Sequence, residues 1–183
     1  MRGVLAICCA GALAWAVWPG PAAPPVPALL AVAPAPEPGL LRGQVRVIDG
    51  DTFEIGTVRI RLQGVDAPER RTTCQDAQGR DWACGAWATR QLRALIGARE
   101  LVCRDLGERT HGRTVAACTL DGQDLGAMLV AEGIVRACPR FARQHPHSRG
   151  YEALEAGAIA DRRGLHAGTT PPRAAFCEPR RPA

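Results

Sequence analysis

The fold of this chain is decided in residues 58–69, which read VRIRLQGVDAPE. Apolar and polar side chains alternate in the first half, with Val58, Ile60 and Leu62 on one side and two arginines on the other. A period of two is typical of a strand that buries one face. We therefore predict a strand here, with Arg61 pointing away from the core.

The second half of this stretch predicts a stiff turn that carries two acids, Asp66 and Glu69. Pro68 has a fixed φ and pushes the preceding residue into an extended conformation, so both carboxylates are held in place. A second acidic pair, Asp49 and Asp51, flanks a glycine just upstream. Asp-Gly is an ordinary hairpin turn, but acids gathered at two rigid turns also suit a divalent ion that prefers oxygen ligands.

The remaining pattern predicts a single α+β domain at residues 41–168. Three strands up to residue 65 are followed by a helix, two strands and two more helices, without alternating strand and helix units. This order excludes a Rossmann-type sheet and favours a small antiparallel barrel. The later elements are expected at 84–96 (helix), 100–106 and 113–120 (a hairpin with its turn at 107–112), 124–132 (helix) and 151–163 (helix).

The first forty residues do not belong to this domain. Residues 1–18 hold one early charge and an apolar run at 3–18, which predicts an export signal or an uncleaved N-terminal anchor that tethers the chain to a membrane. Residues 19–40 form a linker dominated by Pro and Ala, and 169–183 form a tail. We expect an exported protein, periplasmic or secreted.

Six of the eight cysteines lie outside the apolar run, an even number that suits an oxidising compartment. Six cysteines allow 15 pairings, so the sequence leaves the connectivity open. Zinc ligation is the weaker alternative because no Cys-x-x-Cys pair occurs in the domain. Our hypothesis pairs Cys74 with Cys84, Cys103 with Cys118, and Cys138 with Cys177.

Charge alone says little about function. The chain has 23 basic residues, all of them Arg, and 18 acidic ones, which gives a formal net charge of +5. A mild basic excess is compatible with a polyanionic partner but is common in proteins that bind none.

Three segments together resemble the signature of the staphylococcal nuclease (thermonuclease) family: 47–52 (VIDGDT), 59–69 and 111–116 (HGRTVA). The resemblance covers residues 44–168. It implies a five-stranded antiparallel β-barrel of the OB type with three α-helices. It also implies calcium-dependent hydrolysis of DNA and RNA.

The resemblance assigns a role to each matching residue. Asp51, Asp66 and the backbone carbonyl of Ala67 resemble the calcium ligands. Glu69 resembles the general base that takes a proton from the attacking water. Two arginines resemble the pair that binds the phosphate, since a planar guanidinium donates two hydrogen bonds at once. These arginines are Arg61 and Arg113.

The chain departs from the family pattern where substrate is gripped. His111 stands where an aromatic residue is usual, and Pro139 marks a second such place, with Phe141 the nearest aromatic residue. Weaker or relocated base stacking is expected. We predict solvated loop residues at Arg70, Arg71, Trp82, His145 and His147, with substrate contact the alternative for the first three and metal binding for the histidines.

Two other functions remain open at this level: a non-catalytic OB-type module that binds nucleic acid or protein, and a disulfide-stapled interaction domain. The ordered set of acids and arginines favours the nuclease. We expect a monomer that acts on single-stranded or denatured DNA or RNA.

Overall fold

The computed structural model describes residues 39–142, 145–168 and 177. The signal or anchor expected at 1–18, almost all of the linker, and the tail at 169–183 apart from Cys177 lie outside the described residues. Within the part of the chain that is described, no helix is long and apolar enough to cross a membrane.

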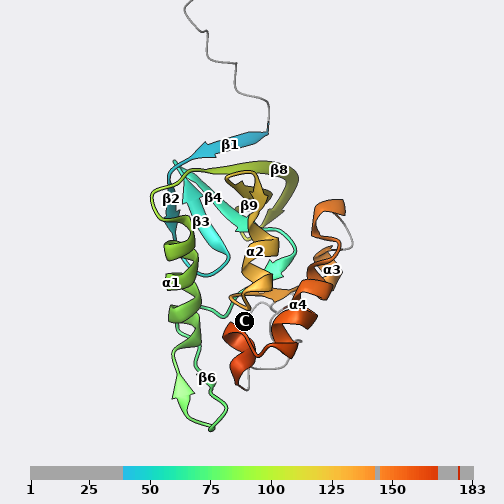
Figure 1. Ribbon diagram of the computed structural model, residues 1–183. Coiled ribbons are helices and arrows are strands. Elements are labelled where there is room, and N and C mark those ends of the chain that lie inside the picture. The colour runs from blue at the N-terminus through green and yellow to red at the C-terminus, as the bar shows by residue number, and fades with distance from the viewer. Residues whose placement is uncertain (1–38, 143–144, 169–176, 178–183) are drawn as a thin grey trace, which may run out of the picture. The chain divides into compact units, whose positions relative to one another are not determined.

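The centre of the domain is one curled sheet of seven strands (Figure 1). The strands run in the order β1-β8-β9-β4-β3-β2, and β10 pairs with β9. Neighbours are antiparallel except β4 and β9, which are parallel, so the expectation of a purely antiparallel sheet is corrected at this pair. The strands are β1 (Leu40–Gly43), β2 (Val45–Val47), β3 (Thr52–Ile55), β4 (Val58–Leu62), β8 (Leu101–Thr110), β9 (Arg113–Leu120) and β10 (Gln123–Asp124).

The first two strands join the edges of this sheet into a barrel. Only Gln44 separates β1 from β2, yet β1 pairs with β8 and β2 pairs with β3. Gly43 permits the bend, because it has φ 153° and a Cβ there would lie 3.3 Å from the side chain of Ile55. Counted as one bent strand, β1 and β2 complete the expected five-stranded OB-type barrel.

The hairpin of β8 and β9 is longer than predicted. The strands continue to Thr110 and resume at Arg113, so the turn is only two residues long rather than 107–112. Its two central residues have positive φ, 48° at His111 and 74° at Gly112, as in the two-residue turns that suit the twist of a hairpin. A register shift between Asp105 and Arg109 absorbs the polar residues that suggested a loop.

The three expected helices are confirmed, and one short helix was not expected. The last of the three ends at Ala160 rather than at residue 163. The helices are α1 (Cys84–Ile96), α2 (Leu125–Ala131), α4 (Tyr151–Ala160) and the unexpected α3 (Pro139–Ala142), with 3-10 turns η1 (Pro146–Ser148) and η2 (Gly164–Ala167). Two small ladders complete the domain: β5 (Val65–Asp66) with β11 (Arg136–Ala137), and β6 (Cys74–Gln75) with β7 (Asp81–Trp82).

The three predicted disulfides are all present. Cys74 bonds to Cys84, Cys103 to Cys118 across the β8–β9 hairpin, and Cys138 to Cys177. The barrel interior and the inner faces of α1 and α2 form one apolar core, whose fully buried members include Phe53, Ile60, Leu92, Leu101, Leu120, Leu125 and Leu129.

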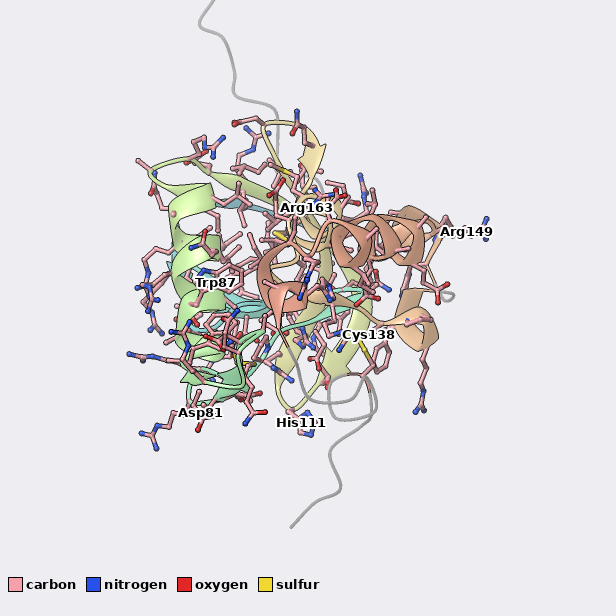
Figure 2. The ribbon with its side chains drawn as sticks, turned by 60° about the horizontal axis from the view of Figure 1, so that its bottom comes forward. Asp81, Trp87, His111, Cys138, Arg149 and Arg163 are labelled. Carbon is pink, nitrogen blue, oxygen red and sulfur yellow. A yellow bond between two sulfur atoms is a disulfide. The ribbon has the colours of Figure 1, made fainter. Side chains whose placement is uncertain are left out.

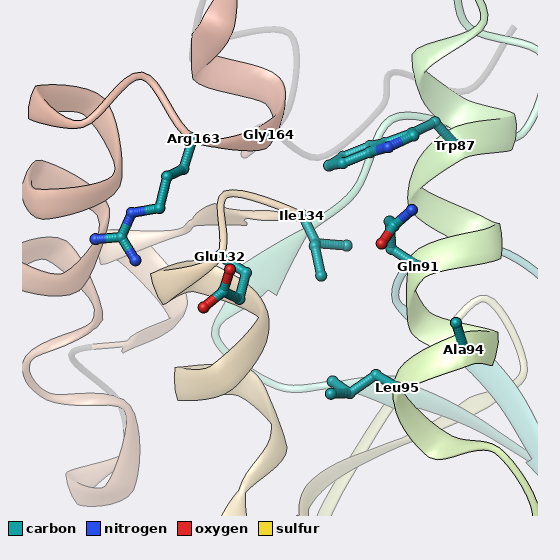
Figure 3. Close-up of a pocket in the computed structure, with 8 residues that line it drawn as sticks. All are labelled: Trp87, Gln91, Ala94, Leu95, Glu132, Ile134, Arg163 and Gly164. Atoms are coloured by element: carbon teal, nitrogen blue, oxygen red, sulfur yellow. The ribbon is translucent and has the colours of Figure 1, made fainter.

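A groove of about 360 Å³ lies between α1 and the segments that follow α2 and α4 (Figure 3). It contains none of the predicted site residues. Its lining comprises Trp87, Gln91, Ala94, Leu95, Glu132, Ile134, Arg163 and Gly164.

One carboxylate joins α2 to α4. Asp124 caps α2 by accepting a hydrogen bond from the Ala127 amide at 2.9 Å, and it accepts a second from the Tyr151 hydroxyl at 2.6 Å. Tyr151 is buried, and burial together with Asp124 raises the pKa of its hydroxyl. The first turns of both helices are therefore fixed to the same group.

We expect Tyr151→Phe to lower the free energy of unfolding by about 1.5–3 kcal/mol, because it removes a buried hydrogen bond to a charged acceptor. Urea denaturation measures this change. Leu154→Ala, at an exposed position on the same helix, is the control and should cost less than about 0.5 kcal/mol. Equal effects of the two substitutions would contradict the role given to Asp124.

Candidate functional site

The first acidic turn is built by its backbone. The amides of Ile48 and Asp49 both donate to the Thr52 carbonyl, at 3.0 and 3.1 Å, which folds the chain tightly between β2 and β3. The Asp51 amide donates to the Asp49 side chain at 3.1 Å. Asp51 is left almost fully buried, at 4% exposure, with its carboxylate turned toward β4 and the second acidic turn.

Glycine is required at the centre of this turn. A Cβ on Gly50 would lie 2.6 Å from the Cβ of Ala67 and 3.1 Å from that of Ala88 on α1. The turn therefore packs directly against the second acidic turn and the helix. The Ala67 amide donates to Asp51 Oδ2 at 2.6 Å, which ties the two turns together.

Arg61 lies between the two acids. It stands opposite Thr52 in the β3–β4 ladder, and its Nη1 lies 2.6 Å from Asp51 Oδ2 while its Nη2 hydrogen-bonds Asp66 Oδ1. The predicted strand face is confirmed, since Arg61 points away from the barrel interior. The side chain is nevertheless only 15% exposed, because the two turns cover it.

Thr52 brings the second arginine to the same place. Its hydroxyl donates to Asp51 Oδ1 at 3.0 Å and accepts from Arg113 Nη1 at 3.2 Å. Arg113 Nε also donates to the Thr110 carbonyl at 3.3 Å, so the guanidinium is held beside the turn of the β8–β9 hairpin. We did not single out Thr52 from the sequence, although its position directly after Asp51 was the available signal.

Burial and charge act strongly on these groups. Burial disfavours a charged Arg61, but the Asp51 and Asp66 carboxylates outweigh it and raise the pKa of this guanidinium. Burial and the nearby Arg61 lower the pKa of Arg113. Burial and the Asp51 carboxylate raise the pKa of Asp49 to about 6. The charge of Glu69 acts on both guanidinium groups, so two arginines and four carboxylates share one field.

The segment that follows the second turn holds Glu69 against α1. The Glu69 carbonyl accepts from the Thr72 amide at 2.7 Å, and the Gly85 amide donates to the Thr72 carbonyl at 3.2 Å. A Cβ on Gly85 would lie 1.8 Å from the Glu69 carbonyl oxygen. The disulfide between Cys74 and Cys84 closes this loop, and the Glu69 side chain is exposed.

Asp66 is anchored from its other side by β11. Asp66 stands opposite Arg136 in the β5–β11 ladder, and Arg136 Nε donates at 3.1 Å to Glu155, which is fully buried on α4. A buried ion pair thus connects α4 to β11, the strand that pairs with the candidate ligand's strand, β5. Sequence reasoning missed this pair because its partners are 19 residues apart in different elements.

The candidate ligand atoms are of the type that calcium prefers. Asp51, Asp66 and the Ala67 carbonyl offer only oxygen atoms, and calcium completes its shell with water and substrate oxygens. Among the described residues, no three His, Cys, Asp or Glu side chains converge closely enough to hold a metal by themselves. A cation at this place would therefore depend on backbone and non-protein oxygens as well as the two carboxylates.

Several of the other residues singled out in the sequence contact neighbouring residues. Trp82 is not a solvated loop residue: it lies on β7 with its ring 5.5 Å from that of Trp87, edge to face. His145 Nε2 lies 2.8 Å from Glu108 Oε1, and burial lowers the pKa of His147. His111 is exposed at the end of the molecule that also carries Asp81 (Figure 2). The carbonyl of Phe141 accepts from Gln63 Nε2 at 2.7 Å.

The chain is similar in sequence to one known protein family and to several individual proteins. Residues 59–167 match the sequence model of the family described as "Staphylococcal nuclease homologue". The succinoglycan biosynthesis protein ExoI of Rhizobium meliloti (strain 1021) is 41% identical over 93 residues, which cover 50% of this chain and 49% of ExoI. An uncharacterized endonuclease of Escherichia coli O157:H7 is 31% identical over 94 residues, 49% of this chain and 55% of the relative. The chain thus spans about half the length of these relatives.

Substitution by alanine should have opposite effects on stability at two helical glycines, Gly85 and Gly157. Gly85→Ala should destabilise the protein by about 1–3 kcal/mol, because the added methyl overlaps a backbone oxygen. Gly157→Ala on α4 should stabilise it by about 0.5–1 kcal/mol, because the nearest atom is 3.8 Å away and alanine favours a helix. Chemical denaturation compares the two variants. A neutral Gly85→Ala would show that the loop is not held in this way.

Proposed function

The chain belongs to the staphylococcal nuclease family, and from that premise we propose that it is a calcium-dependent nuclease that hydrolyses phosphodiester bonds of DNA, RNA or both. The observation that carries the proposal is the placement of Arg61 between Asp51 and Asp66, with Arg113 joined to them through Thr52. Two guanidinium groups and two carboxylates in one partly covered site suit a phosphate and a cation together.

Arg61 and Arg113 bind and orient the phosphodiester. Their guanidinium groups donate to its non-bridging oxygens and stabilise the negative charge that grows as water attacks. Their positions are fixed before substrate arrives, since Arg61 is paired within the site and Arg113 is bonded to Thr52 and the Thr110 carbonyl. Arg61 must exchange contacts with Asp51 and Asp66 for contacts with the phosphate oxygens when substrate binds.

Glu69 is the general base. It takes a proton from a water molecule as the water oxygen attacks phosphorus in line with the leaving oxygen. The bond between phosphorus and the leaving oxygen breaks, and that oxygen gains a proton from solvent. Arg113 is not assigned as the acid, because an arginine holds its proton too tightly for this role.

Asp51, Asp66 and the Ala67 carbonyl are the proposed calcium ligands. When bound, calcium supplies positive charge that reduces repulsion between the phosphodiester and the approaching nucleophile. The proximity of Asp49 to Asp51 adds negative charge at the same turn and favours a cation there.

The relatives support the reaction class without fixing the substrate. Two of them are named endonucleases, from two Escherichia coli sources, whereas ExoI is named for succinoglycan biosynthesis. The proposed partners are single-stranded or denatured nucleic acids, bound by a monomer. A non-catalytic module that binds nucleic acid on the same barrel surface is the alternative function.

The purified protein should cleave denatured DNA in calcium and lose this activity in the chelator EGTA. Glu69→Gln should lower kcat by about 10²- to 10⁴-fold because it removes the base. Glu100→Gln, at another exposed glutamate, is the control and should leave kcat unchanged. Oligonucleotide cleavage assays measure both effects.

Cleavage that persists in EGTA would contradict calcium dependence. Binding of nucleic acid without cleavage at any calcium concentration would favour the non-catalytic module instead. Equal activity of the Glu69→Gln and Glu100→Gln variants would remove Glu69 from the mechanism.

We further propose that the chain is exported, to the periplasm or the medium. The three disulfides support this, because such bonds persist in oxidising compartments and are rare in the cytosol. Residues 3–18 serve in this proposal either as a cleaved signal or as a retained anchor that tethers the chain to a membrane.

After expression in a bacterium with a periplasm, cell fractionation should find the protein outside the cytosol. Alkylation under denaturing, non-reducing conditions should detect no free thiol at any of the six cysteines that form the disulfides. N-terminal sequencing then distinguishes a cleaved signal from a retained anchor. Recovery from the cytosol with reactive thiols would contradict export.

A further inference from the structure

Two arginines beside Glu69 have no role in the chemistry described above. Arg70 and Arg71 are exposed and line an open depression of about 560 Å³ together with Glu69 and Ala86 of α1. Within the described residues neither side chain makes a hydrogen bond or an ion pair. Of the other 16 described arginines, eight form an ion pair, for example Arg46 with Glu54 and Arg99 with Asp121.

Two acids close in the chain, Asp76 and Glu69, interact with other groups. Asp76, at the tip of the β6–β7 hairpin, accepts from the backbone amides of Gln78 and Arg80, both at 2.9 Å. Its other oxygen lies 2.8 Å from Arg80 Nε. The one carboxylate in the lining is that of Glu69, which acts on Arg61 and Arg113 from its place in the site.

The backbone that carries the two arginines is held on both sides. Pro68 precedes Glu69 and is buried, and the Thr72 amide that follows the arginines donates to the Glu69 carbonyl at 2.7 Å. Both arginines therefore lie inside one hydrogen-bonded turn. The disulfide of Cys74 and Cys84 fixes the end of the segment to the start of α1. Two free cations are thus presented from a fixed backbone rather than from a loose loop.

We propose that Arg70 and Arg71 form a second phosphate subsite, which binds the backbone of the nucleic-acid strand next to the bond that is cut. This subsite rests on the proposed nuclease function and deepens it. Guanidinium groups bind phosphate in bidentate fashion, and a strand that passes Arg61 and Arg113 brings its neighbouring phosphates past Glu69. The enzyme therefore prefers a polymer to a dinucleotide, which has no neighbouring phosphate to offer.

The test compares two single-stranded DNA substrates, a 12-mer and a dinucleotide, cut by the purified chain in calcium. Arg70→Ala with Arg71→Ala should lower the ratio of kcat/KM for the 12-mer to that for the dinucleotide roughly tenfold, mainly through KM. The slope of log kcat/KM for the 12-mer against log salt should become shallower by about 1.4, because each phosphate contact with a single strand contributes about 0.7.

Two further variants separate a subsite from general charge and from folding. Arg42→Ala with Arg149→Ala removes the same charge at exposed positions, and Arg149 lies far from the end that carries Asp81 (Figure 2), so the ratio should stay within about twofold. Arg70→Lys with Arg71→Lys keeps both charges, so the slope of log kcat/KM against log salt should stay close to that of the wild type. Thermal unfolding should be unchanged in all three, since every position is exposed.

A double alanine variant at 70 and 71 that behaves like the Arg42 and Arg149 control would overturn the subsite while leaving the nuclease intact. Equal losses on the 12-mer and the dinucleotide would also overturn it, because they would place the arginines at the cut bond. A wild-type chain that cuts neither substrate would overturn the proposed function itself.

Discussion

The candidate site depends on one buried cation held between two carboxylates. Arg61 is directed from β4 toward Asp51 on the turn before β3 and Asp66 on β5, and all three side chains are largely shielded from water. Two buried carboxylates without a counter-charge would repel each other and lose hydration. The guanidinium compensates both, so the three elements that carry these residues are held at one place.

Around this ion pair, close backbone contacts leave the loops little freedom. Gly50 lets the first acidic turn touch Ala67 and α1, and Gly85 lets the start of α1 approach the Glu69 carbonyl. A single methyl at either glycine would overlap its neighbour. The helix is therefore both a wall of the core and the support of the segment that carries Glu69, the proposed general base, and the Cys74–Cys84 disulfide closes that segment.

The barrel and the three main helices could be predicted from the sequence, because they follow from local periodicity and a family resemblance. The disulfide pairing was a hypothesis chosen among 15 possible pairings, and the structure contains all three bonds. The strand pattern correctly directs Arg61 away from the core. It does not show that Arg61 is shielded from water, because the turns that cover this side chain come from other segments. The predicted turn at 107–112 is wrong, because polar residues continue β8 through a register shift near Asp105. Thr52 and the ion pair of Arg136 with Glu155 depend on tertiary contacts that no local pattern contains.

We propose that Asp51 and Asp66, held by Arg61, are calcium ligands. Calorimetric titration of calcium into the purified protein tests it directly. The wild type should bind one calcium ion, and Asp51→Asn and Asp66→Asn should each weaken binding by at least about tenfold, while Asp81→Asn, at an exposed acid, should not. Equal binding by all four proteins, or no binding by the wild type, would contradict the claim.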